Sequence, residues 1–132
     1  MAKVTILGAT GNVGTFCAHT IGHIPYVDKI LLHGREGREN LLAGITRDLS
    51  DCFAAAGHDV DLSWTTSFAD TGDSDVIVCT AGVARKPGQD RLDLALENAR
   101  IVSKMAGAIG MHAPRAMFLM VTNPVDVMTS VA

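Results

Sequence analysis

The chain has 132 residues, of which 48% are hydrophobic and 19% are charged, and its formal net charge is −3. These values predict a single globular domain with a modest hydrophobic core, and they leave too little length for a second domain. The acidic balance and the lack of a basic run give no support to a nucleic-acid or membrane-surface role. We therefore expect its partners to be small anions or other subunits.

The three cysteines, Cys17, Cys52 and Cys79, are odd in number, form no C-x-x-C pair and fall within apolar patterns. They are expected to be reduced core residues of a cytoplasmic protein. The apolar run in the N-terminal sequence MAKVTILG is too short to predict a secretion signal or a membrane span. No metal site is expected.

Short apolar runs alternate with apolar stripes at helical spacing along the chain. The runs predict strands at residues 4–7, 30–32, 60–64, 75–81 and 116–122. The stripes predict helices, the first ended by Pro25, the second ended by Gly57 and the third with an apolar face from Leu94 onward. This βαβ repetition predicts an α/β fold. Because such crossovers are nearly always right-handed, we expect a Rossmann-type parallel sheet with helices on both faces and strand order 3-2-1-4-5.

The sequence GATGNVG lies between the first predicted strand and the first predicted helix. Glycines there let the chain turn tightly, let a phosphate approach the backbone and let the helix pack against the strand. The helix N-terminus supplies free amides for a pyrophosphate. A glycine triplet alone is a weak signal, but its strand, turn and helix context favours a dinucleotide site over a plain turn. The predicted cofactor contacts are Gly8, Ala9, Thr10, Gly11, Asn12, Val13 and Gly14.

The second predicted strand ends without the acidic residue that usually binds the ribose hydroxyls of NAD. Gly34 stands at that position, and Arg35 and Arg38 follow it. Two cations without a competing carboxylate suit a 2′-phosphate, so NADP is preferred over NAD as the cofactor. The sequence leaves open that Glu36 or Glu39 serves the ribose instead, or that these are only charged loop residues.

Arg85 and Arg91 follow the fourth predicted strand in the sequence TAGVARKPGQDRLDL. Ligands of open α/β sheets bind outside the carboxyl ends of the strands, and a guanidinium can bind a carboxylate with two parallel hydrogen bonds. The two arginines therefore predict a binding site for a dicarboxylate. A solvated basic loop is the alternative, because Lys86 and Asp90 stand among them.

The motifs GATGNVG, TAGVARKPGQDRLDL, ENARIV and VTNPVDVMT together resemble the amino-terminal half of the malate and lactate dehydrogenases, and the resemblance spans the whole chain. The glycine motif is shared with many dehydrogenases, whereas the arginine loop and TNPVD are more specific. The segment LLHGRE looks most like the archaeal NADP-using malate dehydrogenases. The resemblance implies that residues 1–132 are the dinucleotide-binding domain of a longer enzyme. That enzyme would transfer hydride between NADP(H) or NAD(H) and malate or oxaloacetate, a reaction of the tricarboxylic acid cycle.

The resemblance also implies roles for single residues. Arg85 would pair with the distal carboxylate of the substrate, and Arg91, on the closing loop, would polarise the reacting carbonyl as a catalytic residue. Lactate-specific relatives usually carry glutamine where Arg85 stands, so Arg85 favours malate. Asn123 would hydrogen-bond the substrate, with a cis bond into Pro124. The implied cofactor contacts beyond the glycine motif are Asn98, Val121, Thr122 and Asn123; a helix-surface role for Asn98 and a plain turn at TNPVD are the alternatives.

The family's proton relay, an Asp and His pair, and its arginine for the other carboxylate would lie beyond residue 132. The five histidines do not replace that relay, since His19 and His23 fall on the first predicted helix and His58 and His112 at the opposite sheet edge. His33 falls at the correct edge but beside the adenosine. Each is expected to be a surface or helix residue rather than a general base. The chain alone is therefore expected to bind cofactor without turnover.

Two other readings of the glycine motif stay open. One is an atypical short-chain reductase-like NADPH-binding protein, although such proteins lack the arginine loop, and no Tyr-x-x-x-Lys base is present. The other is a noncatalytic dinucleotide sensor. In the dehydrogenases the helix that carries Arg47 to Asp51 is a subunit contact, so a homodimer or homotetramer of the full protein is expected by analogy.

Overall fold

The computed structural model describes residues 1–132 as alternating strands and helices. The strands are β1 (Ala2–Leu7), β2 (Val27–His33), β3 (Asp61–Thr65), β4 (Val76–Cys79) and β5 (Met117–Met120). The helices are α1 (Asn12–Ile21), α2 (Glu39–Ala56), α3 (Arg91–His112) and α4 (Val125–Val131), with a short 3-10 helix η1 (Phe68–Thr71).

All five strands are parallel and form one sheet in the order β3-β2-β1-β4-β5. The predicted Rossmann-type topology is therefore confirmed. β1 lies at the centre, where Leu7 pairs with His33 of β2 on one side and with Cys79 of β4 on the other. The chain reverses its winding direction at β1, so the carboxyl ends of β1 and β4 flank the point at which ligands bind in such sheets.

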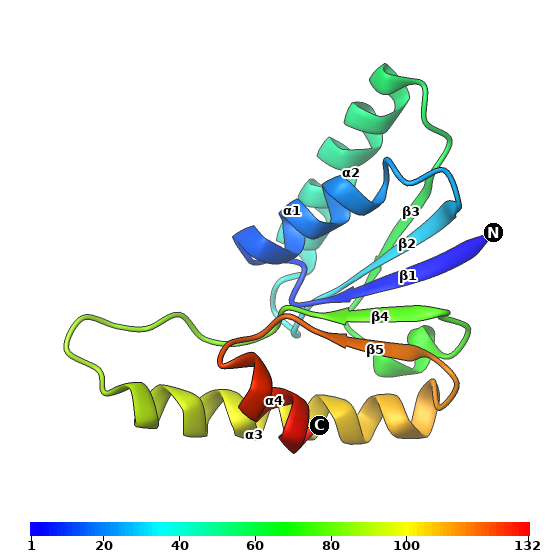
Figure 1. Cartoon of the computed structure of the whole chain (residues 1–132). Helices are drawn as coiled ribbons and strands as arrows, with labels where there is room; N and C mark the ends of the chain where they lie inside the picture. The colour runs from blue at the N-terminus through cyan, green and yellow to red at the C-terminus, as the bar shows by residue number, and fades with distance from the viewer.

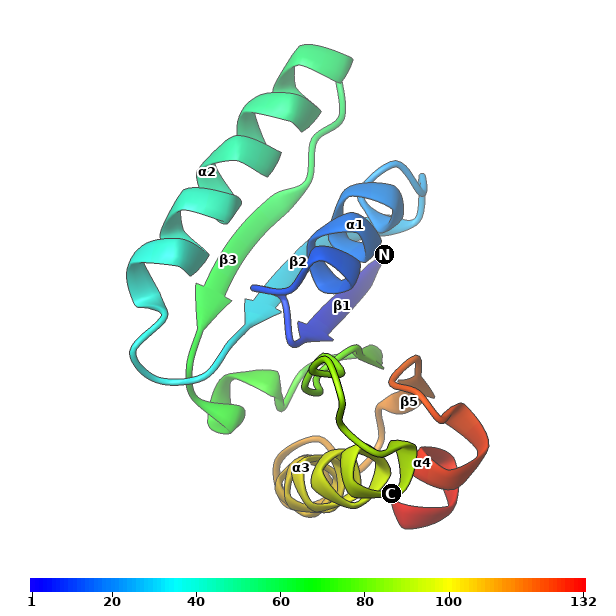
Figure 2. The same ribbon diagram turned by 90° about the vertical axis from the view of Figure 1, so that its left-hand side faces the viewer.

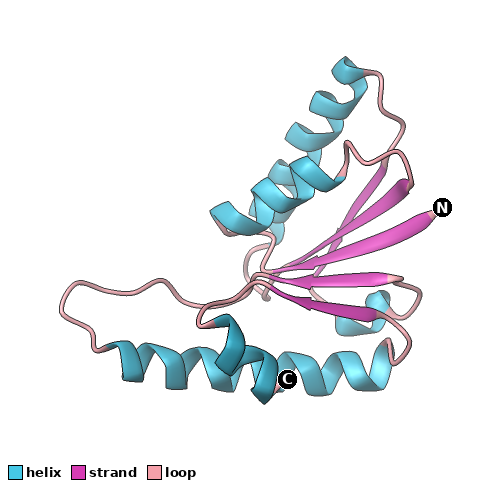
Figure 3. Cartoon of the chain, viewed as in Figure 1, coloured by secondary structure: helices cyan, strands magenta, loops and turns pink.

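The helices cover both faces of the sheet (Figures 1 and 3). α1 and α2 lie on one face and α3 and α4 on the other, as the turned view of Figure 2 also shows. Successive strand residues point to opposite faces, so Ile6 and Val78 join the core under α1 and α2, whereas Leu7, Ile77 and Cys79 join the core under α3 and α4. The two cores bury both faces of the central strands, as an all-parallel sheet requires.

Three helix boundaries can be compared with those that the sequence predicted. Gly57 ends α2 with a positive φ of 74°, as predicted. Pro25 does not end α1, because α1 stops at Ile21 and the chain then turns through short hydrogen bonds such as Ile24 N to Ile21 O, 2.9 Å. α3 begins at Arg91, three residues before the first apolar position of its predicted stripe.

Other predicted boundaries shift by a few residues. β2 is longer than predicted, β3 runs one residue later, and β4 and β5 are shorter, because a strand ends where its neighbour in the ladder ends. The prediction that all three cysteines are core residues was wrong. Cys79 is buried, Cys17 is half-buried and Cys52 is exposed on α2, and all three are free thiols.

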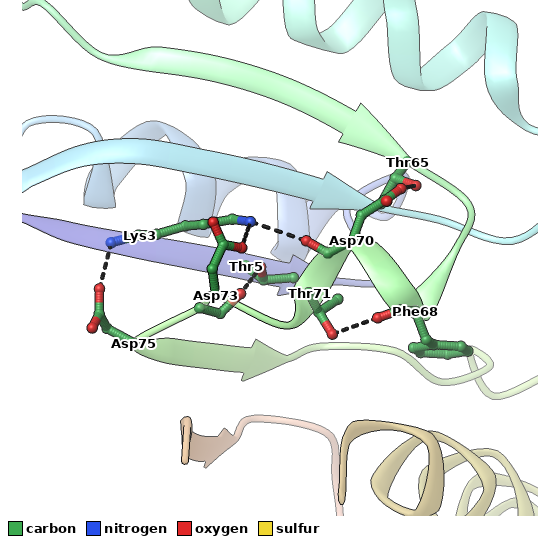
Figure 4. A network of polar contacts seen from close by, with 9 residues as sticks. Lys3, Thr5, Thr65, Phe68, Asp70, Thr71, Asp73 and Asp75 are labelled. Atoms are coloured by element: carbon green, nitrogen blue, oxygen red, sulfur yellow. Dashed lines mark hydrogen bonds and ion pairs between the residues drawn. The ribbon is translucent and has the colours of Figure 1, made fainter. Parts of the chain in front are cut away.

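A polar network fastens η1 to the amino-terminal part of β1 (Figure 4). The ammonium of Lys3 forms an ion pair with Asp73 and donates to the carbonyl of Asp70 at 3.0 Å. The backbone amide of Lys3 donates to the carboxylate of Asp75 at 2.9 Å, and the hydroxyls of Thr5 and Ser74 share a buried hydrogen bond of 2.7 Å. These contacts hold η1 and the segment that follows it against β1. None of the helices is both long and apolar enough to cross a membrane.

Candidate functional site

The glycine loop between β1 and α1 is tied to the end of β2 through its backbone. Gly8 has a φ of 81°, in the left-handed region that favours glycine. The amides of Gly8 and Ala9 both donate to the carbonyl of His33, at 3.1 Å each. The loop is thereby held at the carboxyl edge of the sheet, beside the N-terminus of α1.

Gly14 lets α1 approach this loop closely. A Cβ atom at Gly14 would lie 2.4 Å from the carbonyl oxygen of Gly8 and 2.9 Å from the Cα of Ala9. These are backbone atoms that cannot turn aside, so the position accepts only glycine in this arrangement. No side chain caps α1 at Gly11, and its first amides stay free for an anion.

A cleft of about 750 Å³ opens between the glycine loop, the end of β2 and α3. Its size is that of a typical cofactor site. Six of the predicted cofactor residues line it, namely Gly8, Thr10, Gly11, Gly34, Arg35 and Arg38. His33, which the sequence placed beside the adenosine, and Glu36, the alternative ribose ligand, also line it. The sequence reasoning missed the other nine, namely Thr66, Phe68, Thr80, Ala81, Gly82, Val83, Ile101, Lys104 and Met105.

One signal for part of the missed wall was present in the sequence. Ile101, Lys104 and Met105 are spaced three and four apart, so they share one face of α3 and turn together toward the cleft. The contributions of η1 and of the end of β3 had no such signal, because only the folded sheet places them beside the glycine loop.

The charges around the cleft are mainly positive. Arg35, Arg38 and Lys104 line it, against the single carboxylate of Glu36. Glu39 does not line it, because its carboxylate accepts a hydrogen bond of 3.0 Å from the amide of Gly37. Hydrogen bonds from nearby backbone amides hold the pKa of Glu39 below its ordinary value. Of the two acids that could serve a ribose, the structure leaves Glu36 at the cleft.

These features fit a dinucleotide. The contact between Gly14 and Gly8 leaves no room for a Cβ, the free amides of α1 suit a pyrophosphate, and three cations at the cleft favour an anionic ligand.

The expectation that every histidine is a surface or helix residue was wrong for His33. His33 is the last residue of β2 and is only 2% exposed, because the neighbouring strands and η1 enclose it. Burial lowers its pKa, a shift that the Thr66 backbone and Asp70 partly oppose. His23 lies in the turn after α1 rather than on the helix, because α1 ends at Ile21.

The arginine loop, residues 80–90, leaves the same sheet edge and closes on itself. Arg85 donates through Nε to the carbonyl of Gln89 at 3.0 Å, and the Lys86 amide donates to the Gln89 side chain at 3.1 Å. The Gln89 amide returns a hydrogen bond of 3.1 Å to the Lys86 carbonyl. Arg85 is exposed and forms no ion pair, so its charge is free for an anion.

Arg91 was expected on the loop, but it is the first residue of α3. Asp90 explains this start, because its carboxylate accepts a hydrogen bond of 3.3 Å from the Leu92 amide and so caps the helix. Arg91 is exposed and without an ion pair. The structure therefore places Arg85 in the loop that follows β4 and Arg91 at the start of α3, both outside the lining of the cleft.

Asn98 ties the arginine loop to the segment after β5. It is 3% exposed, its side-chain oxygen accepts from the Val83 amide at 2.8 Å, and its side-chain nitrogen donates to the Asn123 carbonyl at 3.2 Å. The helix-surface alternative for Asn98 is thus wrong. Asn123 itself is exposed, and the Asn123–Pro124 bond is cis, as the resemblance implied.

The remaining predicted cofactor residues lie around the cleft rather than in its lining. Ala9 is a buried residue of the glycine loop, and Asn12 and Val13 are exposed on the first turn of α1. Val121 is half-buried. Thr122 is buried, and its hydroxyl donates to the Ala81 carbonyl at 2.7 Å.

The family model for the lactate/malate dehydrogenase NAD-binding domain matches residues 2–132. The chain belongs to this family. It corresponds to the amino-terminal, NAD-binding part of these dehydrogenases, and the alternative of a short-chain reductase-like protein is set aside.

Named relatives agree with this assignment. The chain is 39% identical over 132 residues to a malate dehydrogenase of Methanosphaera stadtmanae, covering all of this chain and 42% of the relative. It is 44% identical over 127 residues to a malate dehydrogenase of Rhodopirellula baltica, covering 96% of this chain and 40% of the relative. The structure of malate dehydrogenase from Archaeoglobus fulgidus in complex with NADH superposes with a TM-score of 0.89 at 39% identity, over 98% of this chain and 43% of that one. The chain thus spans about two fifths of the length of these relatives.

Proposed function

We propose that residues 1–132 are the cofactor domain of an NAD(P)-dependent malate dehydrogenase whose catalytic domain would follow in the full protein. The proposal is carried by one arrangement: a dinucleotide-sized cleft, with two arginines that form no ion pair, Arg85 in the loop after β4 and Arg91 at the start of α3. Identity of 39% and 44% to curated malate dehydrogenases supports malate over other 2-hydroxy acids.

The bound nicotinamide would supply the hydride donor or acceptor for interconverting oxaloacetate and malate. The residues of this chain would bind and orient the cofactor and the substrate. The glycine loop and the α1 amides would hold the pyrophosphate, and Arg85 would bind the distal carboxylate through paired hydrogen bonds. Arg91 would polarise the reacting carbonyl, and Asn123 would hydrogen-bond the substrate. The proton relay is assigned to the proposed catalytic domain, so this chain alone is expected to bind without turnover.

We further propose a preference for NADP over NAD. Its support is the group of cations at the cleft, Arg35, Arg38 and Lys104, opposed by Glu36 alone. Changing Arg35→Asp places a carboxylate where the 2′-phosphate would bind and should reverse the ratio of NADPH to NADH affinity, by roughly tenfold or more. Arg115→Asp is the matched control, because Arg115 is exposed after α3 and lies outside the cleft lining. An unchanged ratio in the Arg35 variant would contradict the preference.

The first test is titration of this chain with NADPH and, separately, NADH, following nicotinamide fluorescence. Tighter binding of NADPH supports the phosphate assignment. Tighter binding of NADH keeps the dehydrogenase assignment and points to Glu36 as the ribose ligand. Binding of neither dinucleotide contradicts an autonomous cofactor domain. In the full-length protein, dinucleotide binding without any response to oxaloacetate would identify a sensor instead of an enzyme.

We also propose that the full protein is a homodimer or homotetramer in the cytoplasm. By analogy with the family, α2 would form the subunit contact, and its exposed Arg47, Asp48 and Asp51 are available for ion pairs across an interface. The free thiols, including the exposed Cys52, suit a reducing compartment. Sedimentation of the full-length protein tests the oligomeric state.

A further inference from the structure

His33 occupies the joint between the glycine loop and the sheet. It ends β2, and it pairs in register with Leu7 of β1 and with Thr65 of β3. Its carbonyl is the acceptor for the two loop amides, those of Gly8 and Ala9. The residue that holds the predicted phosphate-binding loop therefore also carries a titratable ring.

The imidazole of His33 is buried without hydrogen-bond partners. It stacks on Phe68 with ring centroids 4.3 Å apart, and neither ring nitrogen has a partner or is open to solvent. Unpartnered buried polar atoms are rare in folded proteins and carry a free-energy cost. Since His33 is part of the cleft wall, its two unpartnered nitrogens lie beside the site where an anion would bind.

The surroundings of the ring favour its neutral form. Burial is the main cause of its lowered pKa, and the Thr66 backbone and then Asp70 on η1 partly oppose that shift. Its neighbours in the ladder are an apolar side chain on β1 and Thr65 on β3, whose hydroxyl donates to Asp70 (Figure 4). The other charged groups at the cleft are Arg35, Glu36 and Arg38 after β2 and Lys104 on α3, with a positive sum that opposes a further cation.

We propose that His33 is a positioning residue of the cofactor cleft that takes up a proton when an anionic dinucleotide binds, so that dinucleotide affinity rises as the pH falls. The inference rests on the proposed function for its ligand, a dinucleotide with a charged pyrophosphate. Anionic phosphates at the loop that His33 holds would offset the surrounding cations and favour the imidazolium. By linkage, a ligand that favours protonation is itself bound more tightly by the protonated protein.

The direction of the pH dependence distinguishes protonation of His33 from protonation of a phosphate on the ligand. A 2′-phosphate monoester loses charge below about pH 6, which would weaken its binding in acid. ADP-ribose avoids this effect, because it contains the adenosine and the pyrophosphate but no phosphate monoester. It is therefore the probe, and binding to this chain is measured by isothermal titration calorimetry. Titrations at about pH 6 in two buffers of different ionisation enthalpy give the number of protons taken up.

For the wild-type chain we expect an uptake of roughly half a proton at about pH 6, and binding roughly threefold to tenfold tighter at about pH 5.5 than at about pH 7.5. His33→Phe keeps an aromatic ring against Phe68 and removes the titration, so uptake and pH dependence should both disappear. His112→Phe is the control at the exposed end of α3 and should behave as wild type.

A second measurement does not depend on a stable variant. The ring-proton NMR signal of His33 in the wild-type chain is titrated with and without ADP-ribose, and its pKa should be higher in the complex. Binding of ADP-ribose without proton uptake, an unshifted His33 signal or uptake that persists in His33→Phe would overturn the inference while the proposed function stands. Failure of ADP-ribose to bind at any pH would contradict an autonomous cofactor domain and overturn the inference with it.

Discussion

The glycine loop and the arginine loop leave the same edge of the sheet, but the protein holds them differently. The glycine loop is fastened to a neighbouring strand, through the hydrogen bonds of Gly8 and Ala9 to His33. The arginine loop projects beyond the strand ends (Figure 1), and the hydrogen bonds of Arg85 and Gln89 stay within it.

This contrast separates two kinds of site. A loop tied to the central strands shares the stability of the core. Residues 85–89, the outer part of the arginine loop, have hydrogen bonds within the segment and open at a low free-energy cost. The cofactor cleft is therefore preformed in this domain. The arginine loop is suited to close over a substrate, and we expect it to need contacts from outside this domain to do so.

Among changes that test this contrast, a substitution at Gly14 of α1 is expected to have the largest effect. Gly14→Ala should abolish dinucleotide binding and lower the free energy of unfolding by about 2–4 kcal/mol, because the new Cβ would collide with the backbone of the glycine loop. Fluorescence titration and urea unfolding measure the two effects. Gly107→Ala on α3 is the matched control, since nothing lies within 4 Å of its Cβ position; it should gain about 0.5–1 kcal/mol. Equal dinucleotide affinity and equal stability of the two variants would refute a tight contact between Gly14 and the backbone of the glycine loop.

The second prediction concerns the charge on the arginine loop. In the full-length protein, Arg85→Gln should reduce kcat/KM for oxaloacetate by roughly tenfold to a hundredfold and shift preference toward pyruvate, because a charge-assisted carboxylate contact is lost. Dinucleotide affinity should not change, since Arg85 lies outside the cleft lining. Steady-state kinetics with both keto acids decide the matter, and retained oxaloacetate preference would count against the assigned role.

The third prediction concerns the root of the arginine loop. Asn98→Ala should cost about 1–3 kcal/mol in urea unfolding, because it leaves the Val83 amide and the Asn123 carbonyl without partners. Asn98→Asp keeps the acceptor for Val83, but it sets a buried carboxylate against the Asn123 carbonyl, so its stability loss should be at least as large. Hydrogen exchange at the Val83 amide should be fast in the first variant and slow in the second. Equally fast exchange in both would show that the oxygen of Asn98 does not hold the loop.

The smallest expected effect is the pH response of the histidines at the opposite edge. Desolvation, and then the neighbouring His58 and His19, lower the pKa of His23 from its ordinary 6.5. A lowered pKa makes the unfolded chain bind more protons, so this stability is fully present above pH 6.5 and is lost as the pH falls from there toward the folded value. In thermal unfolding, the melting temperature should fall less between about pH 7.5 and about pH 5.5 in His23→Gln than in wild type. His112→Gln should show the same fall in melting temperature as wild type. An identical fall in all three proteins would exclude His23 and its neighbours His19 and His58 as the source of this pH dependence.

Chain topology and part of the cleft lining could be predicted because their signals are local. The alternation of apolar runs and helical stripes predicted the strand order, and GATGNVG predicted the loop that the structure confirms. Boundaries were weaker because competing local features set them. Asp90 starts α3 at Arg91 by capping it, and α1 ends at Ile21 without help from Pro25.

The burial of single side chains was beyond the sequence reasoning. Cys52 lies in an apolar stripe yet is exposed, because α2 turns that position away from the sheet. His33 looked like a surface residue yet is buried, because η1 brings Phe68 against it.

The sequence by itself determined the family, the order of the elements and the chemistry available at the sheet edge, since each depends on residue types and their spacing along the chain. Only the tertiary structure decided which side chains meet there. It set Lys104 of α3 around the same cleft as Arg35, joined Val83 to Asn123 through Asn98, and enclosed the ring of His33. Such contacts join residues far apart in the chain, and their geometry exists only when both faces of the parallel sheet are covered.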